Sequence, residues 1–236
     1  ALIGVLREGE TELRSAAAWA LSRLGDKRAL PVLREMLHSE YPLLRSRAAR
    51  ALGVMGDIES IDDLRRILRQ EDCPDIKTAY AAALGALRDR ETLEDILALL
   101  DNATNDQYRA ELSLASARIL GGGHRFSRLW RKVHGDMPAG ISAALLDLSK
   151  PLALSFSNDS DILRDMGEAS RALAHESLDV GGRAIAKFVQ RLPLFQFTNV
   201  GEVLLRHCAA RLEDSHPGQP EYILLILHVL QEQIRT

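Results

Sequence analysis

The fold follows from four stretches of sequence that align with one another: LRSAAAWALSRLGDKRALPVL (13–33), LRSRAARALGVMGDIESIDDL (44–64), IKTAYAAALGALRDRETLEDI (76–96) and RAELSLASARILGGGHRFSRL (109–129). Their starts are offset by 31, 32 and 33 residues. Self-similarity at a period of this length is typical of repeat proteins, in which each repeat packs against its neighbours. The sequence therefore predicts a stack of repeated units over residues 1–135.

Equivalent positions in the four stretches carry apolar residues. The four sets are Leu21, Leu52, Leu84 and Ala117; Leu24, Met55, Leu87 and Leu120; Leu30, Ile61, Leu93 and Phe126; and Leu33, Leu64, Ile96 and Leu129. Within a stretch the apolar residues recur at spacings of three and four, which places them on one face of a helix. A second apolar series follows a short break. Each unit is therefore predicted to be a pair of antiparallel helices.

The break between the two helices carries turn residues. Gly25 and Gly56 can adopt the left-handed conformation that ends a helix. An aspartate follows each break, and its side chain can cap the next helix; these aspartates are Asp26, Asp57 and Asp89. The third unit has Arg88 where glycine is expected. The fourth has Gly121-Gly122-Gly123 in place of the Gly-Asp turn and Arg109 at a core position, which predicts a register slip of one residue.

The pattern L-R-x-x-A-A-x-A-L-x-x-x-G-D resembles the short HEAT-like repeat found in phycobilisome lyases and in many bacterial proteins of other function. The resemblance covers about residues 1–135. It implies an all-α fold, an α-α superhelix in which antiparallel helix pairs form a solenoid. About four pairs are expected, the first of them truncated. Because the chain begins at Ala1 within an apolar segment, we expect it to be a piece of a longer protein.

The period is lost in residues 136–236, where proline and glycine interrupt the chain repeatedly. Helices are expected near residues 140–149, 159–176, 181–191, 199–213 and 220–234. We interpret this half as degenerate helical pairs that continue the stack and cap its C-terminal end; a separate helical domain is the alternative. The stretch YILLILHVL (222–230) is apolar on nearly every side, which predicts a buried or covered helix.

Charge and composition narrow the range of functions. The net charge is −3, with 21 Lys+Arg and 20 Asp+Glu in residues 1–135, and 9 and 13 in residues 136–236. This balance disfavours nucleic acid as a partner.

Cys73 and Cys208 form no CxxC pattern, and the seven histidines include no HxxxH pair, so we expect neither metal nor cofactor. No catalytic motif stands out, and a cytoplasmic location is expected.

A ladder of basic residues occupies equivalent positions, each near the start of a helix: Arg14, Arg45 and Lys77. Arg47 and Arg50 add to it. Stacked repeats would place these cations on one face, where they could bind an acidic or phosphorylated peptide or a nucleic-acid backbone. The alternative, which we favour, is that they pair with nearby acidic residues and fix the register of the repeats.

Trp19 lies between the apolar positions of its helix, on the side expected to face the concave surface. An exposed Trp near Arg50 resembles a binding hot spot, and cation–π contact between them is conceivable. The alternative is that Trp19 packs against a neighbouring repeat. Tyr80 aligns with core alanines, so packing is expected for it, whereas Tyr108 could extend the exposed surface.

Three functions remain from the sequence. The first is a non-catalytic interaction, scaffold or regulatory module that binds a peptide or partner protein on its concave face, in a larger protein that could be membrane-attached. This rests on analogy with similar arrays. The second, which the resemblance to phycobilisome lyases implies, is the handling of a bilin chromophore. The third, nucleic-acid binding, fits the charge least well.

Overall fold

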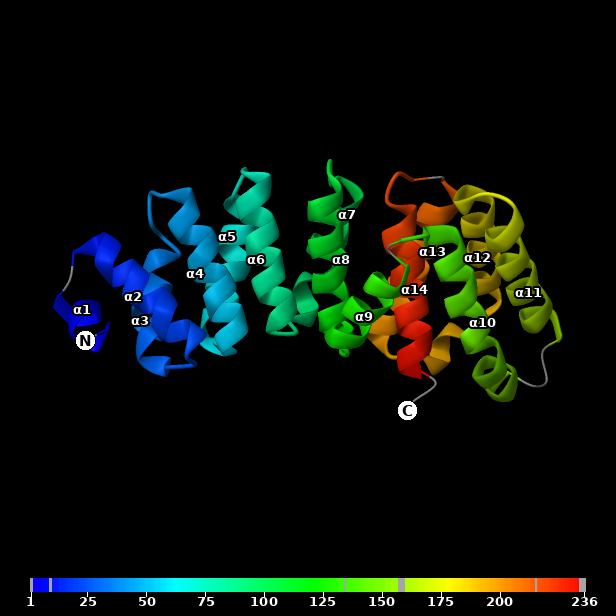
Figure 1. Cartoon of the computed structure of the whole chain (residues 1–236), viewed down its shortest axis with the longest axis horizontal. Helices are drawn as coiled ribbons and strands as arrows, with labels where there is room; N and C mark the ends of the chain where they lie inside the picture. The colour runs from blue at the N-terminus through cyan, green and yellow to red at the C-terminus, as the bar shows by residue number, and fades with distance from the viewer. Residues whose placement is uncertain (1, 9, 134, 157–159, 215, 234–236) are drawn as a thin grey trace. The chain divides into compact units, whose positions relative to one another are not determined.

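The computed structural model describes residues 2–8, 10–133, 135–156, 160–214 and 216–233. Throughout these residues the regular secondary structure is helical, as the sequence predicts. The chain divides into two compact units, Ala1–Ile119 and Leu120–Thr236 (Figure 1). The expected boundary after residue 135 lies further along the chain than this division.

The first unit consists of α-helices joined by short turns, several of which are single 3-10 turns. Its elements are α1 (Leu2–Glu8), α2 (Thr11–Arg23), η1 (Lys27–Ala29), α3 (Leu30–Met36), α4 (Pro42–Met55), η2 (Ile58–Ser60), α5 (Ile61–Gln70), α6 (Pro74–Ala86), η3 (Arg90–Thr92), α7 (Leu93–Asp101) and α8 (Asp106–Leu120). The longer helices pack in succession, α2 against α4 and α4 against α6 (Figure 1). Repeated antiparallel pairs of this kind are the predicted solenoid architecture.

The predicted turn geometry is present at three successive breaks. Gly25 and Gly56 have φ of 71° and 68°, in the left-handed region where glycine meets no Cβ penalty. Arg88 occupies the equivalent position with φ of 57°, although a non-glycine residue is strained there. The turn thus keeps one backbone shape in all three repeats, and at Arg88 the side chain is accommodated at a cost.

Replacing Arg88 with glycine is expected to stabilise the first unit by about 0.5 kcal/mol. Relief of left-handed strain contributes about 1 kcal/mol, and the greater freedom of glycine in the unfolded chain offsets part of it. Arg88 is exposed, so its side chain gives up little packing. The reverse swap, Gly56→Arg, is expected to destabilise by about 1 kcal/mol. Urea unfolding of both variants measures the effect, and a loss of stability in Arg88→Gly would contradict the strain argument.

The turn aspartates do not all act as the sequence predicts. Asp26 accepts a hydrogen bond from the Arg28 backbone amide at 3.0 Å, as expected of a cap. The carboxylates of Asp57 and Asp89 instead accept hydrogen bonds from arginines of the preceding repeat.

These two pairs form what we call the arginine–aspartate locks, Arg34–Asp57 and Arg65–Asp89. In each pair the guanidinium uses two nitrogens: the Nε of Arg34 donates to Asp57 at 2.8 Å, and that of Arg65 donates to Asp89 at 2.9 Å. Both aspartate side chains are only 4 % exposed. Each lock therefore joins the last helix of one repeat to the turn of the next.

Two glycines set the distance between the longer helices. A Cβ on Gly53 of α4 would lie 2.7 Å from the Cα of Ala83, and one on Gly85 of α6 would lie 2.7 Å from the Cα of Ala115. No real Cβ approaches backbone so closely, so both contacts require glycine. Ala83 of α6 and Ala115 of α8 therefore occupy equivalent positions, and they are 32 residues apart in the sequence. The alignment of the third and fourth stretches has an offset of 33 residues, one more than this. This is the predicted register slip.

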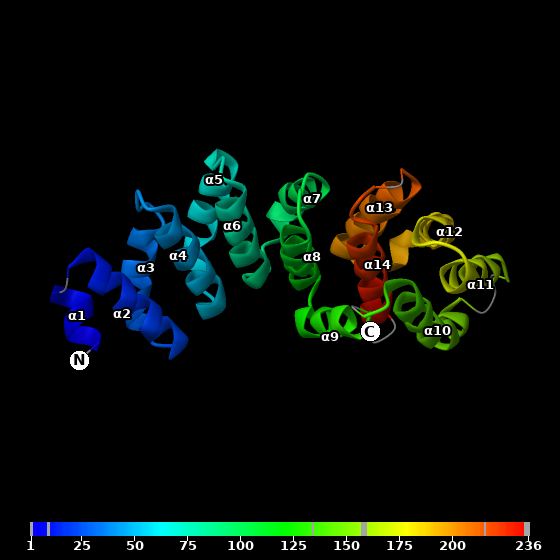
Figure 2. The same ribbon diagram turned by 45° about the horizontal axis from the view of Figure 1, so that its top comes forward.

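The second unit consists of the remaining helices: α9 (Gly123–Val133), α10 (Met137–Ser155), α11 (Ser160–His175), α12 (Leu178–Arg191), η4 (Leu194–Gln196), α13 (Asn199–Glu213) and α14 (Gln219–Gln233). Consecutive helices from α10 to α14 pack against one another, and α14 also contacts α9, α10 and α12 (Figure 2). Residues 222–230 are fully or almost fully buried. The apolar stretch in the sequence is thus the central helix of this unit.

The break expected near Pro151 is absent, and the helix expected to begin at Gly181 begins at Leu178, because packing outweighs local propensity. Pro151 lies inside α10, which continues to Ser155. An interior proline costs about 3 kcal/mol, but Leu148 and Leu152 on the same helix are buried. Gly181 lies inside α12, where a Cβ would meet Leu173 at 2.4 Å. Of the expected helix start at Asn158–Asp161, Asn158 and Asp159 lie outside the described residues, and α11 begins at Ser160.

The glycine-rich turn before α9 holds a carboxylate of the chain itself. Gly122 has φ of 68°, and a Cβ there would lie 2.7 Å from Glu232. Arg125 binds the same carboxylate at 2.5 Å. The buried His228 lies 2.8 Å from the carbonyl oxygen of Gly121, so its Nε2 must donate this hydrogen bond. The turn therefore joins α9 to the end of α14.

Candidate functional site

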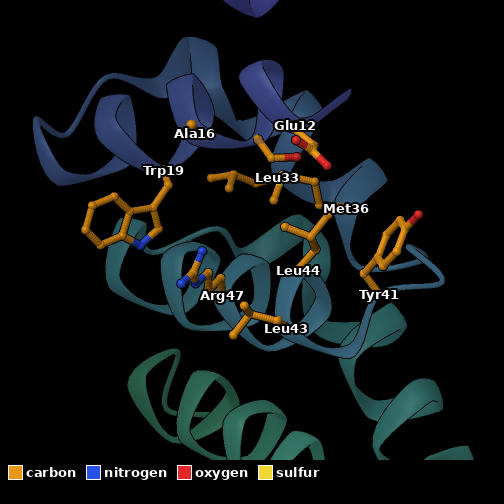
Figure 3. A pocket seen from close by; sticks show the side chains of 10 residues that line it. Glu12, Ala16, Trp19, Leu33, Met36, Tyr41, Leu43, Leu44 and Arg47 are labelled. Atoms are coloured by element: carbon orange, nitrogen blue, oxygen red, sulfur yellow. The ribbon is translucent and has the colours of Figure 1, made fainter. Parts of the chain in front are cut away.

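A pocket of about 620 Å³ opens between three segments of the first unit. It is lined by Glu12, Ser15, Ala16 and Trp19 of α2, by Leu33 and Met36 of α3, and by Tyr41, Leu43, Leu44 and Arg47 at the start of α4. Figure 3 shows Trp19 and Tyr41 at opposite ends of the pocket, with Leu33 and Met36 between them. The pocket thus has a largely apolar floor with an aromatic side chain at each end.

The local structure explains why these aromatic side chains are exposed. Helix α2 buries Ala17, Ala18 and Leu21, so Trp19 is directed away from the core and is 47 % exposed. Tyr41 immediately precedes Pro42, which begins α4. A residue before proline favours extended backbone, and Tyr41 has φ of −83° and ψ of 114°. Its ring lies outside the helix and is 66 % exposed.

The pocket also carries charge. Arg47 is exposed, and no carboxylate among the described residues pairs with it. Glu12 lines the opposite side, on α2 (Figure 3). The guanidinium of Arg23 lies 5.7 Å from the ring centroid of Trp19. The cation observed at Trp19 is therefore Arg23, from the same helix, whereas the sequence suggested Arg50.

The first two members of the basic ladder are engaged in contacts within the repeats. Arg14 binds Glu35 at 2.8 Å and donates to the carbonyl of Leu6. Arg45 binds Glu71 at 3.0 Å and donates to the carbonyl of Ser39 at 3.0 Å. These are the contacts of the alternative interpretation, in which the ladder fixes the repeats.

The electrostatics of Glu71 agree with that structural role. Burial alone would raise the pKa of the Glu71 carboxyl. Hydrogen bonds from the Cys73 backbone and from Arg45 outweigh burial, so the pKa lies below its ordinary value. Glu71 therefore stays ionised near neutral pH and keeps Arg45 in place.

The remaining basic residues, Arg50 and Lys77, have different surroundings from each other and do not share a site. Arg50 binds Glu111 of α8 with both terminal nitrogens. Lys77 lines a smaller pocket of about 190 Å³ together with Tyr108. With the slipped register, Arg109 becomes the next member of the ladder, and it donates to the carbonyl of Ala103 at 3.1 Å, much as Arg45 does to Ser39. Of the residues singled out in the sequence, Trp19 and Arg47 line the larger pocket together, and Lys77 and Tyr108 line the smaller one.

Several residues of this pocket were not predicted from the sequence, above all Tyr41 and Leu43. A signal for Leu43 was present: Glu12 and Asp75 stand at the equivalent positions of the neighbouring repeats. Leu43 is 59 % exposed. An apolar residue that replaces an acid at an exposed repeat position is unusual and indicates a binding surface. Tyr80, by contrast, is buried as predicted.

The described residues contain no group of three or more His, Cys, Asp or Glu side chains arranged to hold a metal ion. Among the same residues, no helix is both long and apolar enough to cross a membrane.

Comparison with known proteins agrees with the repeat architecture. The family model for HEAT repeats matches residues 1–45 and 35–116. No curated protein sequence and no solved structure matches the chain. The match is to HEAT repeats in general, so the phycobilisome-lyase subclass stays a prediction. Together with the helical pairs and their turns, the match identifies residues 1–116 of the chain as HEAT repeats.

Proposed function

We propose that the first unit is an interaction module that binds a segment of a partner protein in the pocket formed by α2, α3 and α4. The observation that carries the proposal is the combination in one pocket of Trp19, Tyr41 and Arg47, which pairs with no carboxylate in the part of the chain that the structure describes. HEAT repeats commonly serve protein interaction and scaffolding. The proposal gives this general role a site.

Trp19 and Tyr41 have the properties of interaction anchors. Aromatic residues and arginine are enriched among the residues that dominate binding energy, because they bury large areas at little entropic cost. Trp19, Tyr41 and Leu43 each leave about half or more of their surface exposed in the absence of a partner. Exposed apolar side chains that gather around one pocket are typical of a binding surface.

Arg47 indicates what the partner segment carries. A cation at the edge of an apolar pocket favours a carboxylate at the corresponding position of the ligand. Arg23 adds a second positive charge beside Trp19, while Glu12 supplies one negative charge. The expected ligand is therefore a peptide with an aromatic or aliphatic anchor and a neighbouring Asp or Glu.

Selection from a displayed random-peptide library tests this function. Peptides recovered on the wild-type chain are expected to share an apolar anchor next to an acidic residue. Trp19→Ala combined with Arg47→Glu is expected to weaken their binding by a factor of about 30 or more, which corresponds to the loss of one hot spot. Fluorescence anisotropy with a labelled peptide measures the change.

Ile58→Ala combined with Arg90→Glu is the matched control. It removes an exposed apolar residue, 72 % exposed, and reverses an exposed arginine outside the pocket. Binding is expected to stay within about twofold of wild type. If both double variants bind the selected peptides equally well, the pocket of α2, α3 and α4 is not the site.

A further inference from the structure

Helix α9 in the second unit presents a one-sided basic surface. Its sequence, GHRFSRLWRKV (123–133), belongs to a stretch without any Asp or Glu between Glu111 and Asp136. Phe126, Leu129 and Val133 are buried on one side of the helix. The basic residues occupy the opposite side at spacings of three and four. They are Arg125, Arg128, Arg131 and Lys132.

Only part of this charge is neutralised within the chain. Arg125 binds Glu232, and Lys132 binds Asp147 at 2.8 Å, in a pair whose side chains are both more than half exposed. Arg128 is exposed, and no carboxylate among the described residues pairs with it. Arg131 donates to the Ser127 carbonyl of its own helix, a neutral acceptor. A local excess of positive charge therefore remains on α9.

A groove of about 480 Å³ runs along this basic surface, between α9, α10 and α14. Arg125, Arg128 and Lys132 line it from α9. Its apolar lining consists of Leu129 of α9 and of Ala144, Leu148 and Pro151 of α10. Asp147, which pairs with Lys132, and Gln231 of α14 complete the lining. The groove therefore combines a rim with an excess of positive charge and an apolar floor.

We propose that this groove docks an acidic segment of a partner protein, with carboxylates on the α9 arginines and an apolar side chain on the floor. The apolar floor favours a peptide over a nucleic-acid backbone, because the backbone presents phosphates and sugars and has no apolar side chain to place there. Charge outside α9 points the same way, because residues 136–236 hold nine Lys+Arg and thirteen Asp+Glu. A long polyanion would meet this acidic surface, whereas a short segment would contact α9 alone.

Fluorescence anisotropy of the 236-residue chain tests the proposal with defined probes. The first probe is a labelled peptide of alternating Glu and Leu pairs, and the second is the same peptide with Ser in place of Leu. The Glu–Leu peptide is expected to bind at least about tenfold more tightly than the Glu–Ser peptide, which cannot fill the floor. Added salt is expected to weaken its binding.

Arg128→Glu combined with Arg131→Glu is expected to weaken binding of the Glu–Leu peptide by about tenfold or more. The matched control, Arg171→Glu combined with Arg206→Glu, changes two exposed arginines elsewhere in the same unit and alters the net charge equally. It is expected to leave binding within about twofold. Circular dichroism checks that both variants keep the helical fold.

Several results would overturn the proposal. They are failure of the wild-type chain to bind the Glu–Leu peptide, equal binding of the two peptides, and equal loss of binding in the two variants. Duplex DNA or phosphatidylserine vesicles serve as competing probes. If either binds more tightly than the Glu–Leu peptide and depends on Arg128 and Arg131, α9 serves that ligand instead. All these titrations are repeated in chains that also carry Trp19→Ala and Arg47→Glu, because the pocket of the first unit is expected to bind a peptide of the same chemistry, and failure here is then separate from failure of that pocket.

Discussion

Arg65→Ala is expected to lower the free energy of unfolding of the first unit by about 3 kcal/mol. Its guanidinium holds the carboxylate of Asp89, which is 4 % exposed, through two nitrogens. Removing one partner of a buried ion pair leaves an uncompensated charge, which typically costs about 3–5 kcal/mol. The Thr92 hydroxyl also donates a hydrogen bond to Asp89, at 2.9 Å. Because Arg65→Ala leaves this bond in place, part of the negative charge on Asp89 stays stabilised.

Arg66→Ala is the matched control in the same helix. Arg66 is 53 % exposed and pairs with Asp63 on the surface. Exposed pairs contribute about 0–1 kcal/mol, so this variant is expected to unfold close to wild type. Adding Asp89→Ala to Arg65→Ala is expected to restore part of the loss, because the buried charge is then gone. Equal effects of Arg65→Ala and Arg66→Ala would show that the lock contributes little.

The same lock predicts a dependence on pH. Burial alone would raise the pKa of the Asp89 carboxyl, but hydrogen bonds from Arg65 and Thr92 outweigh it, and the pKa lies below its ordinary value. A lowered folded-state pKa adds stability above the unfolded value of about 3.9, and this stability is lost as pH falls through the folded-state value. The difference between wild type and Arg65→Ala is therefore expected to be full near pH 7 and to shrink as pH falls through the range in which the buried Asp89 carboxyl takes up its proton.

Unfolding of the first unit can be followed separately because each unit holds one tryptophan, Trp19 in the first and Trp130 in the second. In a Trp130→Phe background, Trp19 fluorescence reports on the first unit. Urea titrations in this background measure all the stability changes predicted for that unit. Circular dichroism of the same samples reports on both units together.

Gly85→Ala is expected to destabilise the first unit by about 2 kcal/mol, although alanine normally stabilises a helix by about 1 kcal/mol relative to glycine. The new Cβ would lie 2.7 Å from the Cα of Ala115 and 2.8 Å from its carbonyl oxygen. Backbone atoms cannot rotate away as a side chain can, so α6 and α8 must move apart. Overpacking of this kind costs about 1–3 kcal/mol.

Gly4→Ala supplies the comparison for the glycine substitution. Gly4 lies in α1, and nothing lies within 4 Å of a Cβ placed there. This variant is expected to be as stable as wild type or slightly more stable. If Gly85→Ala behaves in the same way as Gly4→Ala, close contact between α6 and α8 is not required for the fold.

The features that could be predicted from the sequence are local ones. Helix α13 spans Asn199–Glu213, as the sequence predicts, because its apolar period and its Thr198 cap lie within the segment itself. The left-handed turns at Gly25 and Gly56 follow in the same way from single residues. The apolar character of residues 222–230 was sufficient to predict a buried helix, although not which helices cover it.

The features that could not be predicted depend on partners distant in the sequence. Asp57 was expected to cap a helix, because the sequence does not show that Arg34 lies beside it in space. Pro151 was expected to end a helix, because the burial of Leu152 emerges only in the folded unit. The candidate pocket was predicted only in part. Trp19 and Arg47 were singled out, whereas Tyr41 comes from a loop whose exposure the period does not predict, and the signal at Leu43 was not used.

The central claim is that the pocket of α2, α3 and α4 binds a partner segment, and the indole N–H signals of the two tryptophans test it directly. A two-dimensional ¹H–¹⁵N NMR spectrum of the chain contains one such signal for Trp19 and one for Trp130, assigned by the Trp130→Phe variant. Titration with a library-selected peptide is predicted to shift the Trp19 signal and leave that of Trp130 in place. A shift of the Trp130 signal with that of Trp19 unchanged would contradict the claim.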